Sequence, residues 1–278
     1  MFADRPSRTA QHNALFRAIE QRLPQPLFAD PWARRFLRGR YRLAALLPAA
    51  ALARAIDARW PGPRAAVSVR TRWIDDAIAV ALARGLDQLV LLGAGFDARA
   101  HRLHGIERVR VFEVDHPATQ AMKRRVVGAA PAHVTYVPVV FGRDALPDAL
   151  ARAGLRPDAR TLLLWEGVTN YLDEPTVDAT LRFAARAGEK LLFTYVDRAV
   201  IDGAKLFAGG PESVAHVKKL GEPFTFGFEP SELPAYLAER GLELEVDLPL
   251  SQVARKYYPG ACPPVSAYYH VVSARCRA

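Results

Sequence analysis

The sequence has little cysteine and no long apolar run, and each shortage excludes a class of protein. Its 278 residues include two cysteines, Cys262 and Cys276, too few for a disulfide framework and outside any cluster of metal ligands. We therefore expect a reducing compartment and no metal site. No run approaches the roughly 18 apolar residues that a membrane span needs, and the N-terminus lacks the apolar core of a signal peptide. These absences predict a soluble cytoplasmic protein with no membrane partner.

Lysine is also scarce, and this scarcity bears on whether the positive net charge indicates a nucleic-acid partner. The formal net charge is +9, but only 6 of the 38 basic residues are lysines, and no block of five like charges occurs. Arginine and alanine are abundant along the whole chain, as a compositional bias would produce. The charge therefore does not predict a nucleic-acid partner, although it is compatible with an acidic small substrate. Half of the residues are hydrophobic, enough for a sizeable core.

The patterning of the chain divides near residue 87. Helical periodicity and proline breaks come first, and strand-like apolar runs alternating with helical patterns follow. The expected helices are 10–22, 31–37, 49–58 and 69–84, with a break at "WPGPR". The expected strands are 88–92, 109–114, 134–137, 161–165 and 190–195. This alternation predicts an α/β fold with a mostly parallel sheet covered by helices on both faces. We predict a helical cap over 1–86, a core over 87–278 and, within it, an insertion at about 200–228.

The last extended segments depart from this alternation. After the helix-like "SELPAYLAERG", segments 242–248 and 266–273 follow without a helix long enough for a parallel crossover. They are expected to pair as an antiparallel hairpin at the edge of the sheet. Five parallel strands closed by such a hairpin are typical of class I S-adenosylmethionine methyltransferases, with their Rossmann-like sheet. A dinucleotide-dependent dehydrogenase would continue with parallel strands.

The stretch "LVLLGAGFDARAHRL" ends a buried strand in a glycine turn. Gly93 and Gly95 allow the backbone to turn sharply and let a ligand lie against bare main chain. An ordinary strand-to-helix turn would look the same. With Ala98 the segment also satisfies the loose pattern G-x-G-x-x-A, so it does not choose between a nicotinamide cofactor and S-adenosylmethionine.

The next strand ends in two carboxylates. In "VRVFEVDHP", strand alternation places Glu113 and Asp115 on one side and Val114 on the other. A carboxylate at this point can accept hydrogen bonds from the ribose hydroxyls of either cofactor. We favour Asp115 as the ribose ligand over Glu113.

Three ordered motifs together resemble a known family. The segments "LLGAGFDARAHRL", "VFEVDHPATQAMKRR" and "LLLWEGVTNYLDEPTV" resemble the leucine carboxyl methyltransferase family. That family includes the protein phosphatase 2A carboxyl methyltransferases and bacterial polyketide carboxyl O-methyltransferases such as the tetracenomycin enzyme. The similarity extends upstream to "SVRTRWIDD", "SRTAQHNALFRAIE" and "PLFADPWARRFL", so it covers most of the chain.

The resemblance implies roles for individual residues toward S-adenosylmethionine, which would leave as S-adenosylhomocysteine. Arg70 matches the arginine that grips the methionine carboxylate, a task that suits a guanidinium fork. Gly93 matches the glycine packed against the cofactor, with Gly95 in the same turn, and Asp115 matches the ribose ligand. Glu166 matches a glutamate near the methionine amine, and a carboxylate among apolar residues needs such a cationic partner.

The chain departs from the family at the adenine position. Relatives commonly carry an aspartate there, whereas this chain has Val140 in "VPVVFGRD". Adenine recognition is then expected from the backbone and packing around Phe141, or from Asp144 in the next turn.

Other polar residues of the motifs are assigned structural roles. Asp97 is expected to cap the following helix, and Arg99 and Arg102 to form structural ion pairs. None of the seven histidines shows an acid–base pairing with a carboxylate, because His116 and its neighbour Asp115 point apart on a strand end.

The acceptor is expected to contact the segments that are not cofactor machinery. These are the N-terminal helices, the loop after the fourth strand and the insertion. Tyr171 is the best candidate for a substrate contact, with packing under the next helix as the alternative. Phe224 could line an apolar pocket or belong to the core. Arg255 and Lys256 could pair with an anionic substrate, although surface charge is the simpler interpretation.

The reaction that the resemblance implies is methyl ester formation on a small-molecule acid. A carboxylate is already ionised near neutral pH and needs no general base, whereas a phenol would gain from one. A peptide or protein C-terminal carboxylate and a phenolic hydroxyl remain alternative acceptors. An NAD(P)-dependent oxidoreductase is less favoured because no Tyr-x-x-x-Lys relay occurs, and a protein that binds the cofactor without transferring methyl is a further alternative.

Overall fold

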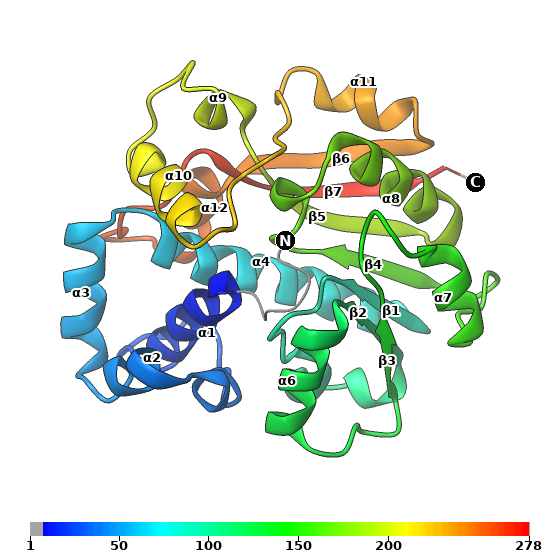
Figure 1. The fold of residues 1–278 in the computed structure, drawn as a ribbon, viewed down its shortest axis with the longest axis horizontal. Coiled ribbons are helices and arrows are strands. Elements are labelled where there is room, and N and C mark those ends of the chain that lie inside the picture. The colour runs from blue at the N-terminus through cyan, green and yellow to red at the C-terminus, as the bar shows by residue number, and fades with distance from the viewer. Residues whose placement is uncertain (1–7, 278) are drawn as a thin grey trace.

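Within residues 8–277, the part of the chain that the computed structural model describes, seven strands form one sheet (Figure 1). The strands are β1 (Gln88–Leu92), β2 (Arg110–Asp115), β3 (Val134–Pro138), β4 (Thr161–Trp165), β5 (Lys190–Val196), β6 (Leu242–Pro249) and β7 (Tyr269–Cys276). Their order is β3-β2-β1-β4-β5-β7-β6; the first five are parallel, and β7 is antiparallel to both its neighbours. This sheet confirms the predicted α/β class and the antiparallel pair at its edge.

Helices cover both faces of the sheet. They are α1 (Arg8–Glu20), α2 (Gly39–Ala44), α3 (Ala49–Arg59), α4 (Pro63–Ala83), α5 (Arg99–Arg102), α6 (Pro117–Val127), α7 (Leu146–Arg152), α8 (Glu174–Ala187), α9 (Arg198–Ile201), α10 (Gly210–Lys219), α11 (Leu233–Ala238) and α12 (Leu250–Tyr257). The short 3₁₀ turns are η1 (Ala33–Phe36), η2 (Ile106–Arg108) and η3 (Thr169–Tyr171). Helices α7, α8 and α11 pack on one face, and α4 packs on the other. Strands β1 and β4 are buried at every position, which explains why they read as continuous apolar runs.

Several predicted boundaries differ from the structure. The helix expected from residue 69 begins at Pro63, because proline is well tolerated in the first turn of a helix and Gly62 adopts a φ of 110° before it. The segment expected as helix 31–37 forms only the turn η1, and α2 was not predicted. The last strand begins at Tyr269 rather than residue 266. The helix α12 lies between β6 and β7, so the edge pair is joined by a long connection rather than a tight turn.

The strand order places a crevice at the carboxyl edge of the sheet. The chain runs outward from β1 to β2 and β3, and then returns to place β4 on the other side of β1. The connections that follow β1 and β4 therefore leave in opposite directions along the sheet. In open α/β sheets, ligands bind at the carboxyl ends of two such neighbouring strands. The motifs after β1, β2 and β4 are therefore brought to one edge.

The N-terminal helices cover this edge (Figure 1). Residues of α1, η1 and α3 share an apolar cluster with Phe96 and Ala98 from the turn after β1. Phe36 stacks on Phe96 with ring centroids 5.0 Å apart, and Arg17 Nη2 donates to Phe96 O at 2.6 Å. The cap thus shares a core with the sheet's loops. The division at residue 86 stays a prediction, and residues 1–7 of the proposed cap lie outside the described part. No helix within 8–277 combines the length and the apolar character needed to cross a membrane.

Candidate active site

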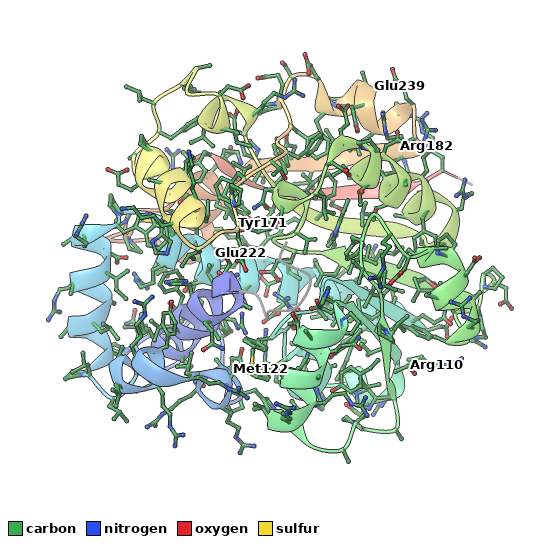
Figure 2. The ribbon with its side chains drawn as sticks, in the orientation of Figure 1. Arg110, Met122, Tyr171, Arg182, Glu222 and Glu239 are labelled. Carbon is green, nitrogen blue, oxygen red and sulfur yellow. The ribbon has the colours of Figure 1, made fainter. Side chains whose placement is uncertain are left out.

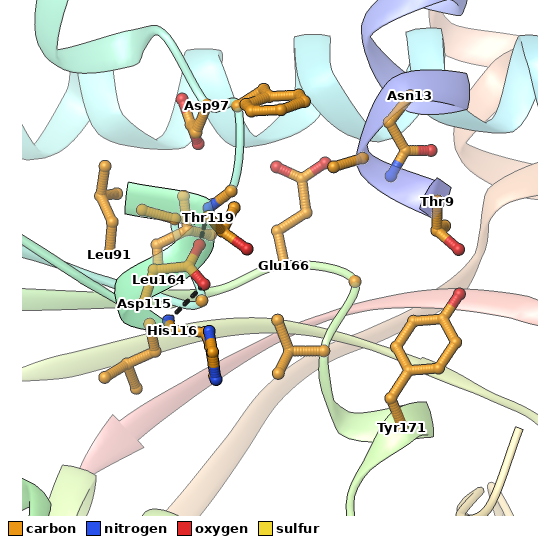
Figure 3. A pocket seen from close by; sticks show the side chains of 18 of the residues that line it. Thr9, Asn13, Leu91, Asp97, Asp115, His116, Thr119, Leu164, Glu166 and Tyr171 are labelled. Carbon is orange, nitrogen blue, oxygen red and sulfur yellow. Dashed lines mark hydrogen bonds between the residues drawn. The ribbon is translucent and has the colours of Figure 1, made fainter. Parts of the chain in front are cut away.

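A cavity of about 450 Å³ lies at the carboxyl edge of the sheet (Figure 3). Its wall contains the ends of β1 and β4, the start of the loop after β2, the segment 139–143 after β3, and one side of α1. The predicted cofactor residues all line it: Arg70, Gly93, Gly95, Asp115, Phe141 and Glu166. Tyr171 lines it as well. The motifs identified in the sequence therefore meet at one cavity.

The glycine turn is held tightly between two neighbouring segments. The N–H groups of Gly93 and Ala94 donate to Val114 O at 2.8 and 2.9 Å. Gly93 has a φ of 71°, and a Cβ placed on it would lie 2.4 Å from Val168 Cγ2. Only glycine satisfies both constraints, so the bare main chain faces the cavity at this point.

The main chain fixes the Asp115 side chain at the carboxyl end of β2. This side chain accepts from Gly95 N–H and, at 2.6 Å, from His116 N–H, as the dashed lines in Figure 3 show. Burial raises the pKa of Asp115 above its usual value, and these two N–H donors oppose the rise. Each carboxylate oxygen can accept a further bond, so the group fits a ribose diol.

Of the two carboxylates of β2, Asp115 lines the cavity and Glu113 does not. The Glu113 carboxylate is fully buried and lies 2.6 Å from Lys123 Nζ on α6. Lys123 Nζ also donates to Asp97 O. Burial raises the pKa of Glu113, and the Lys123 ammonium opposes that rise. Glu113 is thus a structural partner of α6.

Six charged side chains form a balanced ion network, and all of them except Asp75 line the cavity. They are Arg70, Asp75, Asp97, Arg99, Arg102 and Glu166. Arg99 lies at the centre, with its Nε 2.7 Å from Asp75 Oδ1 and its Nη1 2.6 Å from Glu166 Oε2. Arg70 Nε lies 2.7 Å from Glu166 Oε1. The three cations balance the three carboxylates, which is what burial requires.

The network modifies the predicted roles of its members. Arg99 and Arg102 form ion pairs as expected, but Asp97, Arg99 and Arg102 also line the cavity. Asp97 Oδ1 accepts from Arg99 N–H at 2.7 Å at the start of α5, close to the predicted cap. Glu166 receives cationic partners from the protein itself. Burial would raise the pKa of Glu166, but the Arg99 and Arg70 guanidiniums outweigh it and hold that pKa below its usual value.

Of the two predicted adenine contacts, Phe141 lines the cavity and Asp144 does not. Asp144 Oδ2 accepts from Val140 N–H at 2.8 Å, and its Oδ1 lies 2.9 Å from Arg143 Nε. The cavity lining includes Phe141 and Gly142 but not Asp144. The aspartate therefore stabilises the loop after β3, and the contact of Phe141 with adenine stays a prediction.

Tyr171 stands between this cavity and a second one. The second cavity, of about 70 Å³, lies between α1, α4 and α10. Figure 2 shows Tyr171 near Glu222 beside α10, and Figure 3 shows its hydroxyl directed toward Thr9 of α1. Thr9 N–H donates to Glu222 at 3.0 Å, which ties α1 to the insertion. Phe224 lines this second cavity, with its ring centroid 5.7 Å from that of Tyr171.

The remaining candidates lie elsewhere. Arg255 and Lys256 are exposed residues of α12 and line neither cavity. His116 lines the large cavity, and its Nδ1 accepts from Ala118 N–H at the start of α6. The expectation that no histidine pairs with a carboxylate was wrong: His270 Nδ1 lies 2.8 Å from Asp247 Oδ1 and 3.0 Å from the Tyr195 hydroxyl.

A model of the leucine carboxyl methyltransferase family matches residues 10–185, more than half of the sequence. The chain belongs to the leucine carboxyl methyltransferase family. S-adenosylmethionine is the cofactor of its relatives. No group of three or more histidine, cysteine or acidic residues within 8–277 could hold a metal ion.

Two relatives of this chain share one description with each other. A Frankia alni protein named as a candidate S-adenosyl-L-methionine-dependent methyltransferase is 40% identical over 168 residues, 59% of each chain. The matched part thus spans less than two thirds of that relative. A Streptomyces avermitilis protein with the same description is 34% identical over 218 residues, 74% of this chain and 75% of the relative.

Solved structures show the fold of the class I methyltransferases. A DUF574 family protein from Streptomyces avermitilis superposes with a TM-score of 0.63 at 14% identity, over 95% of this chain and 96% of that one. A candidate methyltransferase from Thermobifida fusca superposes with a TM-score of 0.62 at 14% identity, over 100% of this chain and 97% of that one. The antiparallel β6 and β7 distinguish this sheet from the parallel second half of a dinucleotide-dependent dehydrogenase.

In this member of the family, replacement of Gly93 by alanine is expected to be costly. The new Cβ would meet Val168. We therefore expect the substitution to lower the free energy of unfolding by about 1–3 kcal/mol more than the same substitution at a glycine with a similar φ but open surroundings. Gly203 is that matched control, since its φ is 70° and nothing lies within 4 Å of its Cβ position. Denaturant midpoints of Gly93→Ala and Gly203→Ala test this, and equal losses would contradict it.

Proposed function

We propose that the protein is an S-adenosylmethionine-dependent O-methyltransferase that forms a methyl ester on the carboxylate of a small-molecule acid, such as a polyketide-like natural product. The proposal combines two separate claims. The first concerns how the large cavity holds the cofactor, and the second concerns the chemistry of the acceptor.

The residues of the large cavity fit S-adenosylmethionine. Arg70 would pair with the methionine carboxylate, Asp115 would accept from the ribose hydroxyls, and Phe141 would pack against adenine. The main chain at Gly93 allows the cofactor to approach closely. When bound, S-adenosylmethionine supplies a methyl group on a sulfonium sulfur, which an oxygen nucleophile can accept in line.

The observation that carries the acceptor assignment is the set of residues shared by the two cavities. Among the described residues, those that line both are Thr9, Asn13, Arg70, Gly167 and Tyr171. None of these side chains is a base near neutral pH, and burial raises the pKa of the Tyr171 phenol. The lack of a base among these five side chains favours a nucleophile that is already ionised, which a carboxylate is near neutral pH and a phenol is not.

The chain would act mainly by positioning the acceptor. Arg70 brings positive charge to the junction, and the hydroxyl of Tyr171 can donate a hydrogen bond there, whereas the Thr9 hydroxyl donates to Glu222. Helix α1 and the insertion with α10 cover the junction and restrict access by water. Holding a carboxylate oxygen in line with the methyl group at near-attack distance supplies most of what this reaction requires.

Calorimetry tests the cofactor claim first. We expect S-adenosylmethionine and S-adenosylhomocysteine to bind the purified protein and NADH to give no heat of binding. Binding of NADH alone would overturn the assignment.

The acceptor claim is tested by the bond that forms. Candidate acids are incubated with methyl-labelled S-adenosylmethionine, and the products are treated with mild alkali. An ester releases labelled methanol under alkali, whereas a phenol ether keeps its label. Label that resists alkali would refute the carboxylate acceptor. A peptide with a free C-terminal leucine and its amidated form are included, and transfer to the free peptide alone would favour the alternative acceptor.

A further inference from the structure

The second cavity has aromatic walls and, among its polar lining residues, an imidazole from α10. Its aromatic lining residues are Phe16, Trp60, Tyr171, Phe224, Tyr268 and Tyr269. His216 of α10 also lines it, and does not line the large cavity. The His216 ring centroid lies 4.4 Å from that of Trp60 and 4.8 Å from that of His12. The cavity is therefore an apolar recess with an imidazole in its wall.

Ser213, another polar residue of this recess, has hydrogen-bond partners. Ser213, one turn before His216, accepts from Trp60 Nε1 at 2.9 Å and from the Tyr268 hydroxyl at 2.5 Å. Ser213 Oγ itself donates to Gly209 O at 2.6 Å. By contrast, His216 Nε2 is buried and has no hydrogen-bond partner within residues 8–277. A buried polar atom without a partner is costly, and a ligand that supplies one would bind more tightly.

The His216 imidazole is suited to form a hydrogen bond with an uncharged group. Burial lowers the pKa of His216, and the nearby Arg40 and Lys219 charges lower it further. Neutral imidazole can donate or accept a hydrogen bond, so it suits a hydroxyl or a carbonyl. A cavity of about 70 Å³ is well below the ~150 Å³ that holds benzene, so it takes a short substituent rather than a fused ring system.

We propose that the second cavity binds the non-reacting end of the acceptor, and that His216 Nε2 selects an acid carrying an uncharged hydroxyl or carbonyl at that end. This inference rests on the proposed function, because it assumes that the acceptor carboxylate lies at the junction. Trp60 and the tyrosine rings enclose the substituent and exclude water from the hydrogen bond. His216 is thus a specificity residue and takes no part in moving a proton.

Matched pairs of acids test the selection by binding alone. The protein saturated with S-adenosylhomocysteine is titrated by calorimetry with omega-hydroxyhexanoate against heptanoate, and with meta-(hydroxymethyl)benzoate against meta-ethylbenzoate. Each pair exchanges a hydroxyl for a methyl of similar size. We expect the hydroxylated member of at least one pair to bind about tenfold more tightly to the parent protein.

Variants of one residue locate the effect. His216→Leu should remove the preference, so that both members bind within about twofold, and His216→Gln, which keeps a donor and an acceptor, should restore part of it. His104→Leu, an exposed histidine outside both cavities, is the matched control and should change nothing. All variants should bind S-adenosylhomocysteine as the parent does, which shows that they are folded.

The outcomes separate the two proposals. A preference that survives in His216→Leu, or no preference for any pair in the parent, overturns the role of His216. Methyl esters formed without a hydroxyl preference would leave the proposed function in place and remove this inference. A hydroxyl preference that depends on His216, without any methyl ester, would support the recess as a binding site and refute the carboxyl transfer.

Discussion

Replacement of Lys123 by methionine is expected to lower the free energy of unfolding by about 3–5 kcal/mol. The substitution keeps the length of the side chain but removes the ammonium that faces the fully buried Glu113. The remaining carboxylate would have to become protonated or draw water into the core. Chemical denaturation of the protein without cofactor measures the loss.

Two further variants distinguish an uncompensated charge from a packing defect. Lys190→Met removes a lysine from a partly exposed pair with Glu245, at the same separation of about 2.7 Å, and should cost at most about 1 kcal/mol. The double variant Lys123→Met/Glu113→Leu should recover most of the stability, because it removes both charges. If Lys123→Met were no more harmful than Lys190→Met, or the double variant recovered nothing, the buried pair would not have the importance that we assign to it.

Arg70→Ala is expected to weaken binding of S-adenosylhomocysteine by about 100-fold or more. Truncating one partner of a buried, hydrogen-bonded charge pair typically costs 2–5 kcal/mol, and 1.4 kcal/mol is tenfold in affinity. Arg70 would lose its contact to the ligand carboxylate and its ion pair with Glu166 together. Calorimetric titration with S-adenosylhomocysteine gives the ratio of affinities directly.

The control for this variant lies on the same helix. Arg72→Ala removes an arginine that is 41% exposed and pairs with Asp76, so it should bind S-adenosylhomocysteine within about twofold of the parent. Arg70→Lys keeps the charge but not the fork, and should fall between the parent and Arg70→Ala. Parent-like affinity in Arg70→Ala would exclude this arginine from the cofactor site. Denaturation midpoints of both variants show whether a loss of binding is a loss of folding.

The cofactor side of the site could be predicted from sequence because its residues follow apolar runs. Gly93 and Glu166 stand directly after a buried strand and Asp115 ends one, and parallel strands bring such positions to one edge. Lys123 was not predicted, although a signal existed. A glutamate inside the apolar run of β2 needs a cation, and the basic cluster of α6 was the nearest source.

The acceptor side could not be predicted in the same way. Trp60 and Ser213 are 153 positions apart and meet only because α10 packs back onto the N-terminal helices. Likewise, Tyr195, Asp247 and His270 come from three strands whose neighbourhood depends on the position of β7. Contacts between positions so far apart in the sequence depend on tertiary packing, which neither periodicity nor spacing encodes.

The position of β7 also has a consequence for synthesis on the ribosome. It follows the other strands in sequence, yet it fills the gap between β5 and β6. A nascent chain can therefore pair β1 to β5 and form the edge of the cofactor cavity while β5 still presents an open, strongly apolar border and β6 has no neighbour. Unpaired strand edges of this kind attract other chains. The period between the emergence of β5 and the pairing of β7 is thus the one in which we expect this protein to be most exposed to aggregation.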